Sequence, residues 1–406
     1  MNQQLDSFDA PASAPFSFTG FDSLIAPIGR ERFFSEYFER KPFLVRRNIA
    51  NYFDSLFSLE AVDALLGTRM LREPDIRRIS SSHKKKGFTE FSRDGVADRN
   101  ALLRGHAEGD TLVFDQADRL HPPLDRALAQ CEAEIRLPFR VNAFLTPPGR
   151  KGFNLHYDTH EVIVLQVSGT KNWRICDNPL PLPHEEQQYS HALTDSANVI
   201  AELTLHPGDM LYLPRGYIHD ASSTDTTSLH ISIALRTRAL REVALVGLKR
   251  ELMASAPMRK MAIFDQHATP AAMAGLRSQL HELAERIDLG GALDEVLHAF
   301  IMGRSRPVEG RLLELERAQP IDHDTPLRVR EDCLFHPFAR GESIRLAVDG
   351  KTVTLPAAVR PVLDYMRSSG TFCAQNLPGL EYESRLLLAK KLHAAGMLRP
   401  AARASV

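Results

Sequence analysis

Three ionisable side chains occupy every second position in the stretch FNLHYDTH, at His156, Asp158 and His160. If this stretch belongs to a β-strand, as the apolar run EVIVLQV after it favours, His156 and Asp158 face the same side. A third ligand fits at His219, which follows the turn in the phrase GDMLYLPRGYIH. Two histidines and one carboxylate form the facial triad of non-haem iron(II) oxygenases, which leaves three adjacent positions on the metal open. We therefore predict that His156, Asp158 and His219 bind a metal ion.

Lys171 is the next candidate, because it follows the turn VSGT and lies two residues before the only tryptophan, Trp173. We expect it on a strand that runs antiparallel to the strand with the ligands. A lysine inside a barrel costs free energy unless an anion pairs with it. The far carboxylate of a metal-chelating 2-oxoglutarate is such an anion, so we predict that Lys171 binds this cosubstrate. The alternative is a lysine on the surface of a turn; Lys151 or Arg215 would then be the next candidates, and Arg174 a poor one.

Two further side chains of the same stretch bear on the site. His160 shares the face of His156 and Asp158 by parity, but a fourth ligand would occupy a position on the metal that the chemistry needs. We therefore interpret His160 as a residue of the substrate pocket or a partner of the ligands, with a residue at the rim as the alternative. Trp173 shares a face with Lys171 and is interpreted as a core residue.

The elements that position these residues are expected to be short β-strands from Thr111 onward. TLVFD and FRVNAFLTP predict two strands, and PPLDRALAQCEAEI, which begins with proline, predicts a helix between them. The stretch from His191 to Leu235 contains short alternating runs, which Pro-Gly, Pro-Arg-Gly and Thr/Ser clusters punctuate. Several such strands predict an antiparallel jelly roll or small barrel.

The regions around this barrel differ in their patterns. Residues 1–17 are interpreted as a disordered leader, and residues 18–237 as the domain that contains the barrel. Residues 238–310 contain LREVALVGLKRELM and PAAMAGLRSQLHELAERI, whose apolar spacing predicts amphipathic helices. We expect these helices to form a homodimer interface. In residues 311–406, SIRLAVDGKTVTLP predicts a hairpin with an Asp-Gly turn, and two helices after it suggest a winged-helix-like domain. The predicted fold class is α+β.

Composition and charge exclude several classes of protein. With 43% hydrophobic and 25% charged residues, the chain is typical of a soluble globular protein. Its net charge of −1 gives no strong nucleic-acid signal. The four cysteines are far apart and form no CxxC pair, which fits a reducing compartment. We recognise no signal peptide and no apolar run of membrane-spanning length, so we expect a cytoplasmic protein with no membrane segment.

Three segments resemble the JmjC-type, cupin-fold ribosomal oxygenases: RVNAFLTPPGRKGFNLHYDTHEVIVLQVSGTKNWRI, GDMLYLPRGYIHDA and SLHISIAL. This family contains peptidyl arginine and histidine hydroxylases that depend on Fe(II) and 2-oxoglutarate. The order of barrel, helical dimerisation segment and winged-helix-like domain is similar too, and the resemblance is strongest from Phe139 to Leu235. It implies a double-stranded β-helix (jelly-roll or cupin) catalytic domain, hydroxylation of an arginine or histidine side chain, and a ribosomal protein as the substrate.

The resemblance also implies roles for individual positions. The three predicted metal ligands fall at the family's iron ligands, and Lys171 falls at the basic residue that binds 2-oxoglutarate. Asn142 matches a polar position that lines the cosubstrate pocket, and His230 occupies a position near the cosubstrate. The lysine in place of arginine and the phrase PRGYIH look more like the eukaryotic histidine-hydroxylating branch than the bacterial arginine-hydroxylating branch.

Two other functions are alternatives to a protein hydroxylase. The same site would serve a 2-oxoglutarate oxygenase that acts on a small molecule or a natural-product precursor peptide, although such a substrate requires no extended helical platform. The chain would otherwise be a non-catalytic module that binds protein or nucleic acid. The C-terminal region is only weakly basic, however, and this function leaves the HxD…H pattern and Lys171 unexplained. Iron-dependent turnover of 2-oxoglutarate discriminates between an oxygenase and a binding module.

Overall fold

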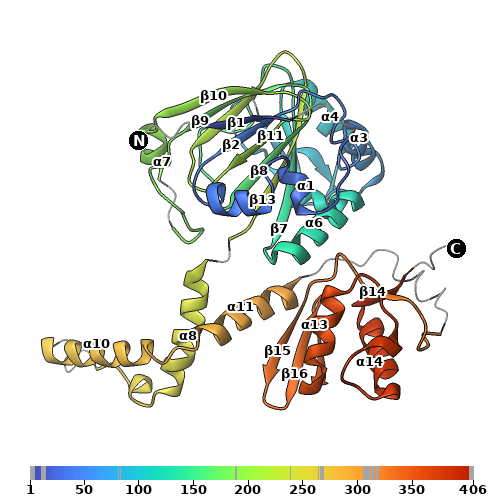
Figure 1. The fold of residues 1–406 in the computed structure, drawn as a ribbon. Helices are drawn as coiled ribbons and strands as arrows, with labels where there is room; N and C mark the ends of the chain where they lie inside the picture. The colour runs from blue at the N-terminus through green and yellow to red at the C-terminus, as the bar shows by residue number, and fades with distance from the viewer. Residues whose placement is uncertain are drawn as a thin grey trace. The chain divides into compact units, whose positions relative to one another are not determined.

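A computed structural model of the chain shows two compact units, Met1–Thr237 and Arg238–Val406 (Figure 1). The structure describes residues 5–10, 15–80, 82, 84–187, 190–237, 239–263, 265, 269–304, 312, 316 and 320–401. No helix among these residues is both long and apolar enough to cross a membrane. The predicted domain boundary between residues 310 and 311 lies outside the described residues.

The first unit is built on two β-sheets. Within its described residues, the large sheet has eight strands in the order β1-β2-β11-β8-β13-β7-β6-β3, and the small sheet has three in the order β10-β9-β12. β1 and β2 run parallel, and the other neighbouring strands run antiparallel. The strands of the large sheet are β1 (Asp6–Asp9), β2 (Phe43–Arg46), β3 (Ile76–Ile79), β6 (Thr111–Phe114), β7 (Phe139–Thr146), β8 (Glu161–Ser168), β11 (Met210–Leu213) and β13 (Ser228–Leu235). The small sheet contains β9 (Lys171–Cys176), β10 (Val199–Leu205) and β12 (His219–Ser223), and β4 (Ser92–Arg93) pairs separately with β5 (Val96–Ala97).

The central strand β8 shows why its sequence is apolar at nearly every position. Ile163 and Leu165 belong to a core on one face of the large sheet, whereas Val162 and Val164 belong to a core shared with the small sheet. Because successive side chains of a strand point to opposite faces, β8 contributes to both cores. The stretch after the predicted ligands is therefore a strand that is buried on both sides.

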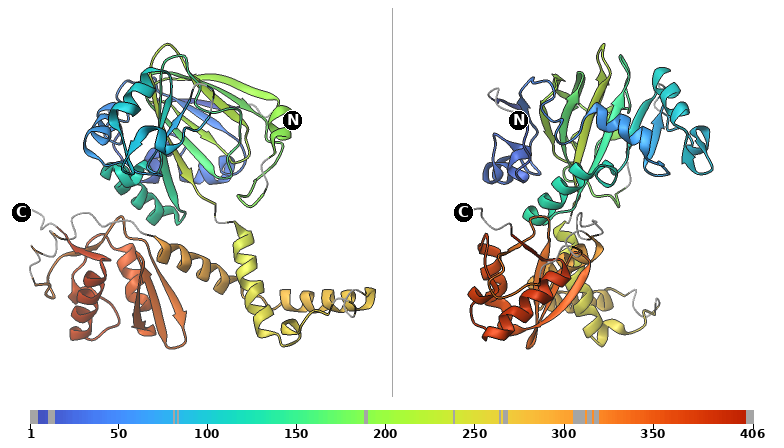
Figure 2. Two further views of the ribbon diagram at one scale, coloured as in Figure 1. Left: turned by 180° about the vertical axis from the view of Figure 1, so that it is seen from behind. Right: turned by 90° about the vertical axis from the view of Figure 1, so that its right-hand side faces the viewer.

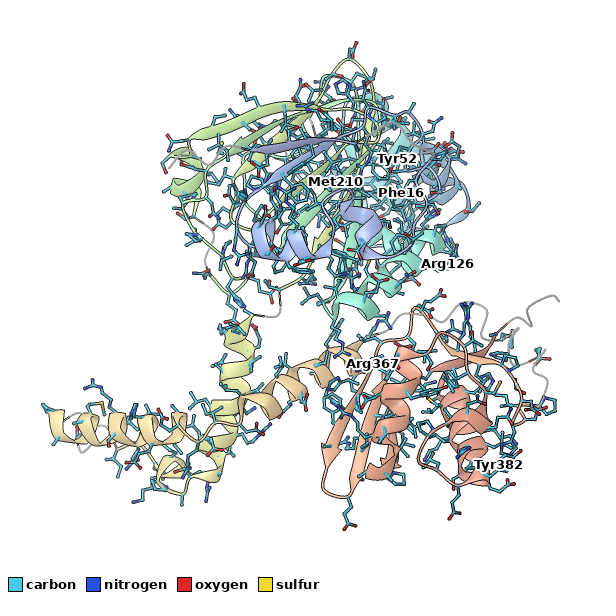
Figure 3. All side chains as sticks on the ribbon, viewed as in Figure 1. Phe16, Tyr52, Arg126, Met210, Arg367 and Tyr382 are labelled. Carbon is cyan, nitrogen blue, oxygen red and sulfur yellow. The ribbon has the colours of Figure 1, made fainter. Side chains whose placement is uncertain are left out.

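Helices cover the face of the large sheet that is turned away from the small sheet (Figure 2). Leu65 of α3 (Leu59–Thr68) and Leu128 of α6 (Pro122–Ile135) pack in the same core as Ile231 of the large sheet. At the edge of this core, Phe16 packs against Tyr52 with ring centroids 5.8 Å apart (Figure 3). The helix predicted at PPLDRALAQCEAEI is confirmed as α6. The helices and turns of the first unit are α1 (Phe21–Ile25), α2 (Arg30–Arg32), the π-helical turn η1 (Phe33–Tyr37), α3 (Leu59–Thr68), the 3-10 turn η2 (Phe88–Phe91), α4 (Arg99–Ala107), α5 (Ala117–Leu120), α6 (Pro122–Ile135) and α7 (His191–Asp195).

The structure differs from the expected disordered leader at β1. Asp6–Asp9 pairs in parallel with β2, which would otherwise leave an open edge of the sheet. Phe8 packs edge-on against Tyr37, and Asp6 accepts a hydrogen bond from Lys41 at 2.8 Å. These partners lie more than 25 residues away along the chain, so nothing local in the sequence predicts the strand. Residues 1–4 and 11–14 of the same region lie outside the described residues.

The second unit contains long helices and a small sheet. The helices and turns are α8 (Leu240–Ala254), η3 (Pro257–Arg259), α10 (Pro270–Ala284), α11 (Leu289–Gly303), η4 (Ala357–Val359), α13 (Arg360–Ser368), η5 (Ala374–Asn376) and α14 (Tyr382–Ala395). The strands are β14 (Leu327–Val329), β15 (Phe335–Arg340), β16 (Ser343–Val348), β17 (Lys351–Pro356) and β18 (Leu398–Pro400). The predicted hairpin is confirmed, because β16 pairs antiparallel with β17 across the Asp349-Gly350 turn. The dimerising role of the helices and the winged-helix character of the C-terminal part stay predictions.

Candidate metal centre

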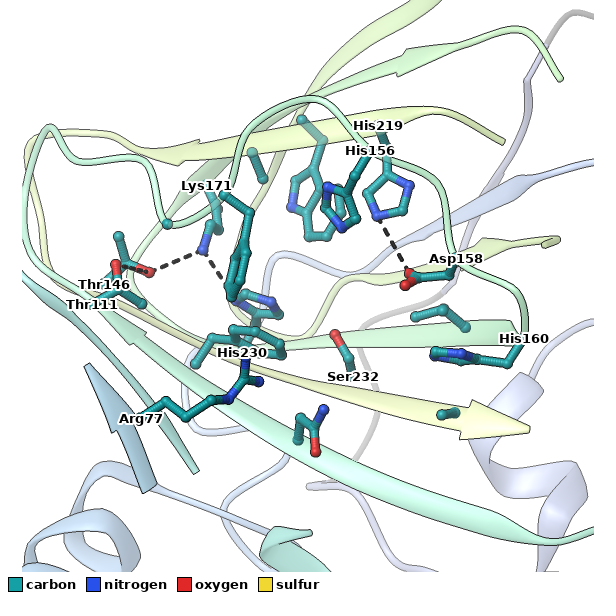
Figure 4. A pocket seen from close by; sticks show the side chains of 18 residues that line it. Arg77, Thr111, Thr146, His156, Asp158, His160, Lys171, His219, His230 and Ser232 are labelled. Carbon is teal, nitrogen blue, oxygen red and sulfur yellow. Dashed lines mark hydrogen bonds and ion pairs between the residues drawn. The ribbon is translucent and has the colours of Figure 1, made fainter. Parts of the chain in front are cut away.

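A cavity of about 270 Å³ lies within the first unit (Figure 4). Its wall combines side chains of the large sheet, the small sheet and the segment before β8. All six predicted site residues line it. The lining residues are Arg77, Thr111, Asn142, Phe144, Thr146, Gly152, Phe153, His156, Asp158, His160, Val162, Lys171, Trp173, His219, Ala221, His230, Ser232 and Ala234.

His156, Asp158 and His219 converge at one end of this cavity, with one ligand atom from each residue within 4.8 Å of the other two. The imidazole rings of His156 and His219 have centroids 4.5 Å apart, and His219 Nε2 lies 3.7 Å from Asp158 Oδ2. Three donors at these separations can bind one metal ion from the same side. The structure thus brings together the three residues that the sequence pattern selected.

The backbone around these ligands is not the regular strand that we expected. β8 begins at Glu161, so His156 and Asp158 lie before it in an irregular segment. A short antiparallel bridge fixes this segment, since His156 N donates to His219 O at 3.1 Å and His219 N donates to His156 O at 2.8 Å. Gly216 N donates to Asp158 O at 3.0 Å. Backbone pairing with the start of β12 and with the turn before it, rather than strand parity, therefore brings His156 and Asp158 to the metal position.

Hydrogen bonds at Nδ1 define which ring nitrogen each histidine offers. His156 Nδ1 lies 2.8 Å from Asn154 O, and His219 Nδ1 lies 3.0 Å from Tyr217 O. A carbonyl oxygen only accepts, so Nδ1 carries a proton in each ring and Nε2 is the nitrogen that is available to bind a metal. Metal-binding histidines usually donate their second N–H in this way. Both rings are thus held in the tautomer that binds a metal through Nε2.

The protonation states of the ligands also suit a metal. Burial, with a contribution from His156, lowers the pKa of His219 to about 4, so this imidazole is neutral at pH 7. Burial raises the pKa of Asp158, but His160, His156 and His219 outweigh that effect and place it below its usual value. Two imidazoles and one carboxylate, with the opposite side facing a cavity, fit the donor set of a non-haem iron(II) site.

Lys171 lies at the other end of the cavity and is buried, with 3% of its surface exposed. Its Nζ donates to Thr146 Oγ1 at 3.1 Å and lies 3.4 Å from His230 Nδ1. Burial lowers its pKa to about 7. Among the residues that the structure describes, no carboxylate forms an ion pair with this ammonium group.

One expectation was wrong: β9, which begins at Lys171, pairs with β10 and β12 of the small sheet and not with β8.

Asn142 and His230 line the cavity from neighbouring strands of the large sheet. Asn142 lies opposite Ser232 in the pairing of β7 with β13, and its Oδ1 accepts a hydrogen bond from Gln116 N at 3.0 Å. His230 is buried and stacks on Phe144, with ring centroids 4.7 Å apart and an angle of 2° between the planes. Burial, with a contribution from the charge of Lys171, places the pKa of His230 well below its usual value.

The other candidates from the sequence are placed as follows. His160 lines the cavity but lies outside the group of three converging donors. Trp173 lines the cavity and also packs in the core between the sheets. Arg174 and Lys151 both pair with Asp220, while Arg215 pairs with Glu39 and Glu161. None of these three cations belongs to the cavity lining given above.

Sequence reasoning missed Arg77 and Ser232. Arg77, on β3, enters the cavity only because β3 pairs with β6, and no motif surrounds it. Its guanidinium donates to Asp115 through two nitrogens, with Nη2 2.6 Å from Oδ1, and lies 5.9 Å from the centre of the Phe153 ring. Ser232 lies two residues after His230 on the same face of β13, so strand parity was a usable signal for it.

Part of the chain is similar in sequence to known proteins. The JmjC domain family matches residues 117–243. Mouse "Ribosomal oxygenase 2" is 35% identical over 237 residues, which are 56% of this chain and 48% of that protein. "Bifunctional lysine-specific demethylase and histidyl-hydroxylase NO66" of Branchiostoma floridae is 32% identical, over 53% of this chain and 32% of that protein. The chain thus spans about half or less of the length of the curated relatives it matches.

A solved structure shows the same fold. The Escherichia coli ribosomal oxygenase YcfD aligns over 91% of this chain and 98% of its own, with a TM-score of 0.53 and 20% sequence identity. A further structure of YcfD contains cobalt and 2-oxoglutarate. The JmjC fold, with mixed α/β content and a large antiparallel sheet, is therefore shared. The chain therefore resembles the JmjC ribosomal oxygenases in the sequence of its matched domain, residues 117–243, and in its fold.

Proposed function

We propose that the chain is an Fe(II)- and 2-oxoglutarate-dependent oxygenase that hydroxylates a side chain of a ribosomal protein. One observation carries this proposal: a buried ammonium group, Lys171, shares a cavity with three converging metal ligands and has no carboxylate partner among the described residues. A buried cation without a counter-charge costs free energy, so its cavity suits an anionic ligand. A dicarboxylate that chelates the metal at one end supplies that charge at the other.

His156, Asp158 and His219 would hold the iron, which with bound 2-oxoglutarate and dioxygen supplies the oxidation that yields succinate, CO2 and a hydroxylated substrate. The chain itself provides orientation and a partly dry pocket. Lys171 would bind the far carboxylate by a charge-assisted hydrogen bond. Thr146, which already accepts a hydrogen bond from Lys171, keeps the ammonium group directed into the cavity.

The relatives support the choice of a protein substrate. Those named "Ribosomal oxygenase" act, by that name, on the ribosome, and the Branchiostoma relative is named as a histidyl-hydroxylase. YcfD has been solved with cobalt and 2-oxoglutarate, and with cobalt and succinic acid. These ligands match the cosubstrate and coproduct that we propose for this chain.

The charges of the cavity favour histidine over arginine as the target residue. Lys171 and Arg77 line the cavity, and among its lining residues the only carboxylate is Asp158, which we assign to the metal. The carbonyl oxygen of Asn142 is already occupied by the backbone N–H of Gln116. A guanidinium group has five hydrogen-bond donors and no acceptor, so it needs acceptors or a counter-charge, and this wall offers few of either. A neutral imidazole has an acceptor nitrogen and carries no charge.

The long helices of the second unit are the surface that we propose for homodimer formation. Many of their large apolar side chains are exposed, and large exposed apolar surfaces mark interaction sites. The exposed residues include Leu240 at 86%, Met253 at 63%, Leu289 at 58%, Leu293 at 56% and Leu245 at 49%. Light scattering at micromolar concentration should give the mass of a dimer, and Leu245→Glu with Leu293→Glu should give a monomer. A wild-type monomer would refute this part of the proposal.

The activity is tested with purified protein, Fe(II) and 2-oxoglutarate. Succinate should form only when iron is present, and mass spectrometry of ribosomal proteins from cells with and without the protein should show one added oxygen atom on a histidine. Free amino acids serve as controls for a small-molecule oxygenase. Absence of iron-dependent succinate formation with every substrate would contradict the assignment as an oxygenase.

A further inference from the structure

A buried charge cluster lies next to the metal ligands and plays no part in the chemistry proposed above. Arg215 is 6% exposed and Glu161 is 1% exposed. Arg215 Nε lies 3.6 Å from Glu161 Oε1, and Arg215 Nη2 also pairs with Glu39. The hydroxyl of Tyr212 donates to Glu161 Oε2 and accepts from Glu39 N at 3.1 Å. Arg215, Glu161 and Tyr212 are thus buried in one network, and Glu39, whose side chain is 35% exposed, lies at its margin.

This cluster joins the two chain segments that carry the ligands. Glu161 is the first residue of β8 and lies three residues after Asp158. Arg215 lies four residues before His219, in the turn between β11 and β12. Arg215 N also donates to Glu161 Oε1 at 3.3 Å, so backbone and side chain of Arg215 contact the same carboxylate.

The backbone continues this connection to the ligands. Next to Arg215, Gly216 N donates to Asp158 O at 3.0 Å. Gly216 has φ +89°, and a Cβ there would lie 2.6 Å from Leu180 O, so the turn requires glycine. Tyr217 O then holds the ring of His219 through Nδ1. A shift of the turn relative to Glu161 would therefore change the separation of Asp158 and His219.

Stability alone is a weak explanation for such a cluster. Burying two charges costs desolvation free energy, and replacing a buried ion pair by apolar residues of similar size is often neutral or stabilising. Glu161 does, however, accept directional hydrogen bonds from the Tyr212 hydroxyl and from the backbone N–H of Arg215, and such a network specifies one geometry. A site that must hold three ligands on one side of a metal benefits from that specificity.

We propose that Arg215 and Glu161 are positioning residues that set the separation of Asp158 and His219 before the metal binds. The inference rests on the metal-binding role proposed for those two ligands. Outer partners of metal ligands typically contribute about 10- to 100-fold to metal affinity. Loss of the Arg215–Glu161 pair should thus weaken metal binding even where the fold is retained.

The test uses the full chain and Co²⁺ as the probe, which reports its geometry by visible absorption. In the double variant Glu161→Leu/Arg215→Met, which leaves no unpaired charge of this pair, the Co²⁺ dissociation constant should rise about tenfold or more. The absorption bands of bound Co²⁺ should also shift. Arg215→Lys, which keeps the charge but has one nitrogen instead of three, should give an intermediate affinity.

The matched control is Asp110→Leu/Arg78→Met, which removes a comparably buried ion pair of the same unit, with Nη2 to Oδ2 at 2.6 Å. This control should lower the melting temperature but leave Co²⁺ affinity and absorption unchanged. Wild-type affinity and spectrum in the Glu161/Arg215 variant would overturn the inference. If that variant does not fold, unchanged Co²⁺ binding by folded Arg215→Lys would overturn it. Failure of the wild type to bind Co²⁺ would instead refute the metal site itself.

Discussion

The two ends of the cavity hold their charged groups in different ways. At the metal end, the backbone positions the ligands: carbonyl oxygens hold both imidazole rings, and a bridge joins His156 to His219. At the other end, Lys171 has neutral partners only, a threonine hydroxyl and an imidazole of strongly lowered pKa. The first end presents three donors that could bind a metal ion, whereas the second has a positive charge that its surroundings do not balance.

This difference separates the expected roles of the two ends. Substitutions at the metal end should remove the metal and with it all chemistry. Substitutions at the lysine end should change the affinity for an anion while the metal site stays intact, because the hydrogen-bond partners of Lys171 among the described residues are Thr146 and His230 and not the three proposed ligands. The following measurements test whether the two ends are separable.

The largest loss of activity is expected when one of the three proposed metal ligands is substituted. His156→Ala, Asp158→Ala or His219→Ala should each abolish 2-oxoglutarate turnover, since two remaining donors bind a divalent metal poorly. Circular dichroism should show that the fold persists, because these side chains are a small part of the core. His206→Ala, a histidine outside the cavity, serves as the control and should turn over 2-oxoglutarate normally. Wild-type activity in His219→Ala would refute the assignment.

Lys171→Ala should leave metal binding nearly intact and strongly weaken 2-oxoglutarate binding. Truncating one partner of a buried charge pair costs about 3–5 kcal/mol, and about 1.4 kcal/mol corresponds to a factor of ten. The dissociation constant should therefore rise roughly a hundredfold to a few thousandfold, as measured by calorimetry with metal-loaded protein. Lys171→Arg should do less damage, because the charge is kept in a larger planar group.

Lys41→Ala provides a lysine control, since Lys41 pairs with Asp6 outside the cavity. It should bind 2-oxoglutarate as the wild type does. An unchanged dissociation constant for 2-oxoglutarate in Lys171→Ala would show that another residue binds the far carboxylate. The two ends of the cavity would then not differ in the way proposed.

The pH dependence of cosubstrate binding should follow Lys171. Burial lowers its pKa to about 7, and only the ammonium form binds the far carboxylate with full strength. Affinity should therefore be constant below about pH 7 and fall as pH rises, by up to about tenfold per pH unit. Titrations between pH 6 and pH 9 should show this slope in the wild type and lose it in Lys171→Ala. A flat profile in the wild type would contradict a proton-linked anchor.

The smallest effect is expected at His160. It lines the cavity beside Asp158 but lies outside the three converging donors, so His160→Ala should change Co²⁺ affinity less than about tenfold. The same variant should weaken peptide substrates more than it weakens the metal. A complete loss of Co²⁺ binding would instead make His160 a ligand and change the metal end into a four-residue site.

Local pattern was sufficient to select three residues that the structure brings together, but not to describe their backbone. His156, Asp158 and His219 are recognisable by residue type and by the turn before His219. The prediction that His156 and Asp158 lie on a regular strand failed, because the bridge to His219 shapes that segment and such tertiary contacts leave no periodic signal. The pairing of β9 with β10 and β12 was missed for the same reason.

Contacts between distant segments account for the other differences. Arg77 reaches the cavity through the pairing of β3 with β6, and β1 exists because Phe8 and Asp6 find partners around β2. Neither pairing has a sequence motif. Ser232, by contrast, followed from the alternation of β13 once His230 was placed.

The position of Trp173 makes its intrinsic fluorescence a reporter of the proposed metal centre. It is the single tryptophan of the chain, lines the cavity, and stacks on the ring of His219 with centroids 5.9 Å apart. Its indole N–H is buried and has no hydrogen-bond partner among the described residues. Intrinsic fluorescence excited at the tryptophan band therefore comes from one place, the wall of the proposed metal centre. A paramagnetic ion bound by His219 would quench that emission, so occupancy of the cavity can be followed in the unlabelled wild-type chain.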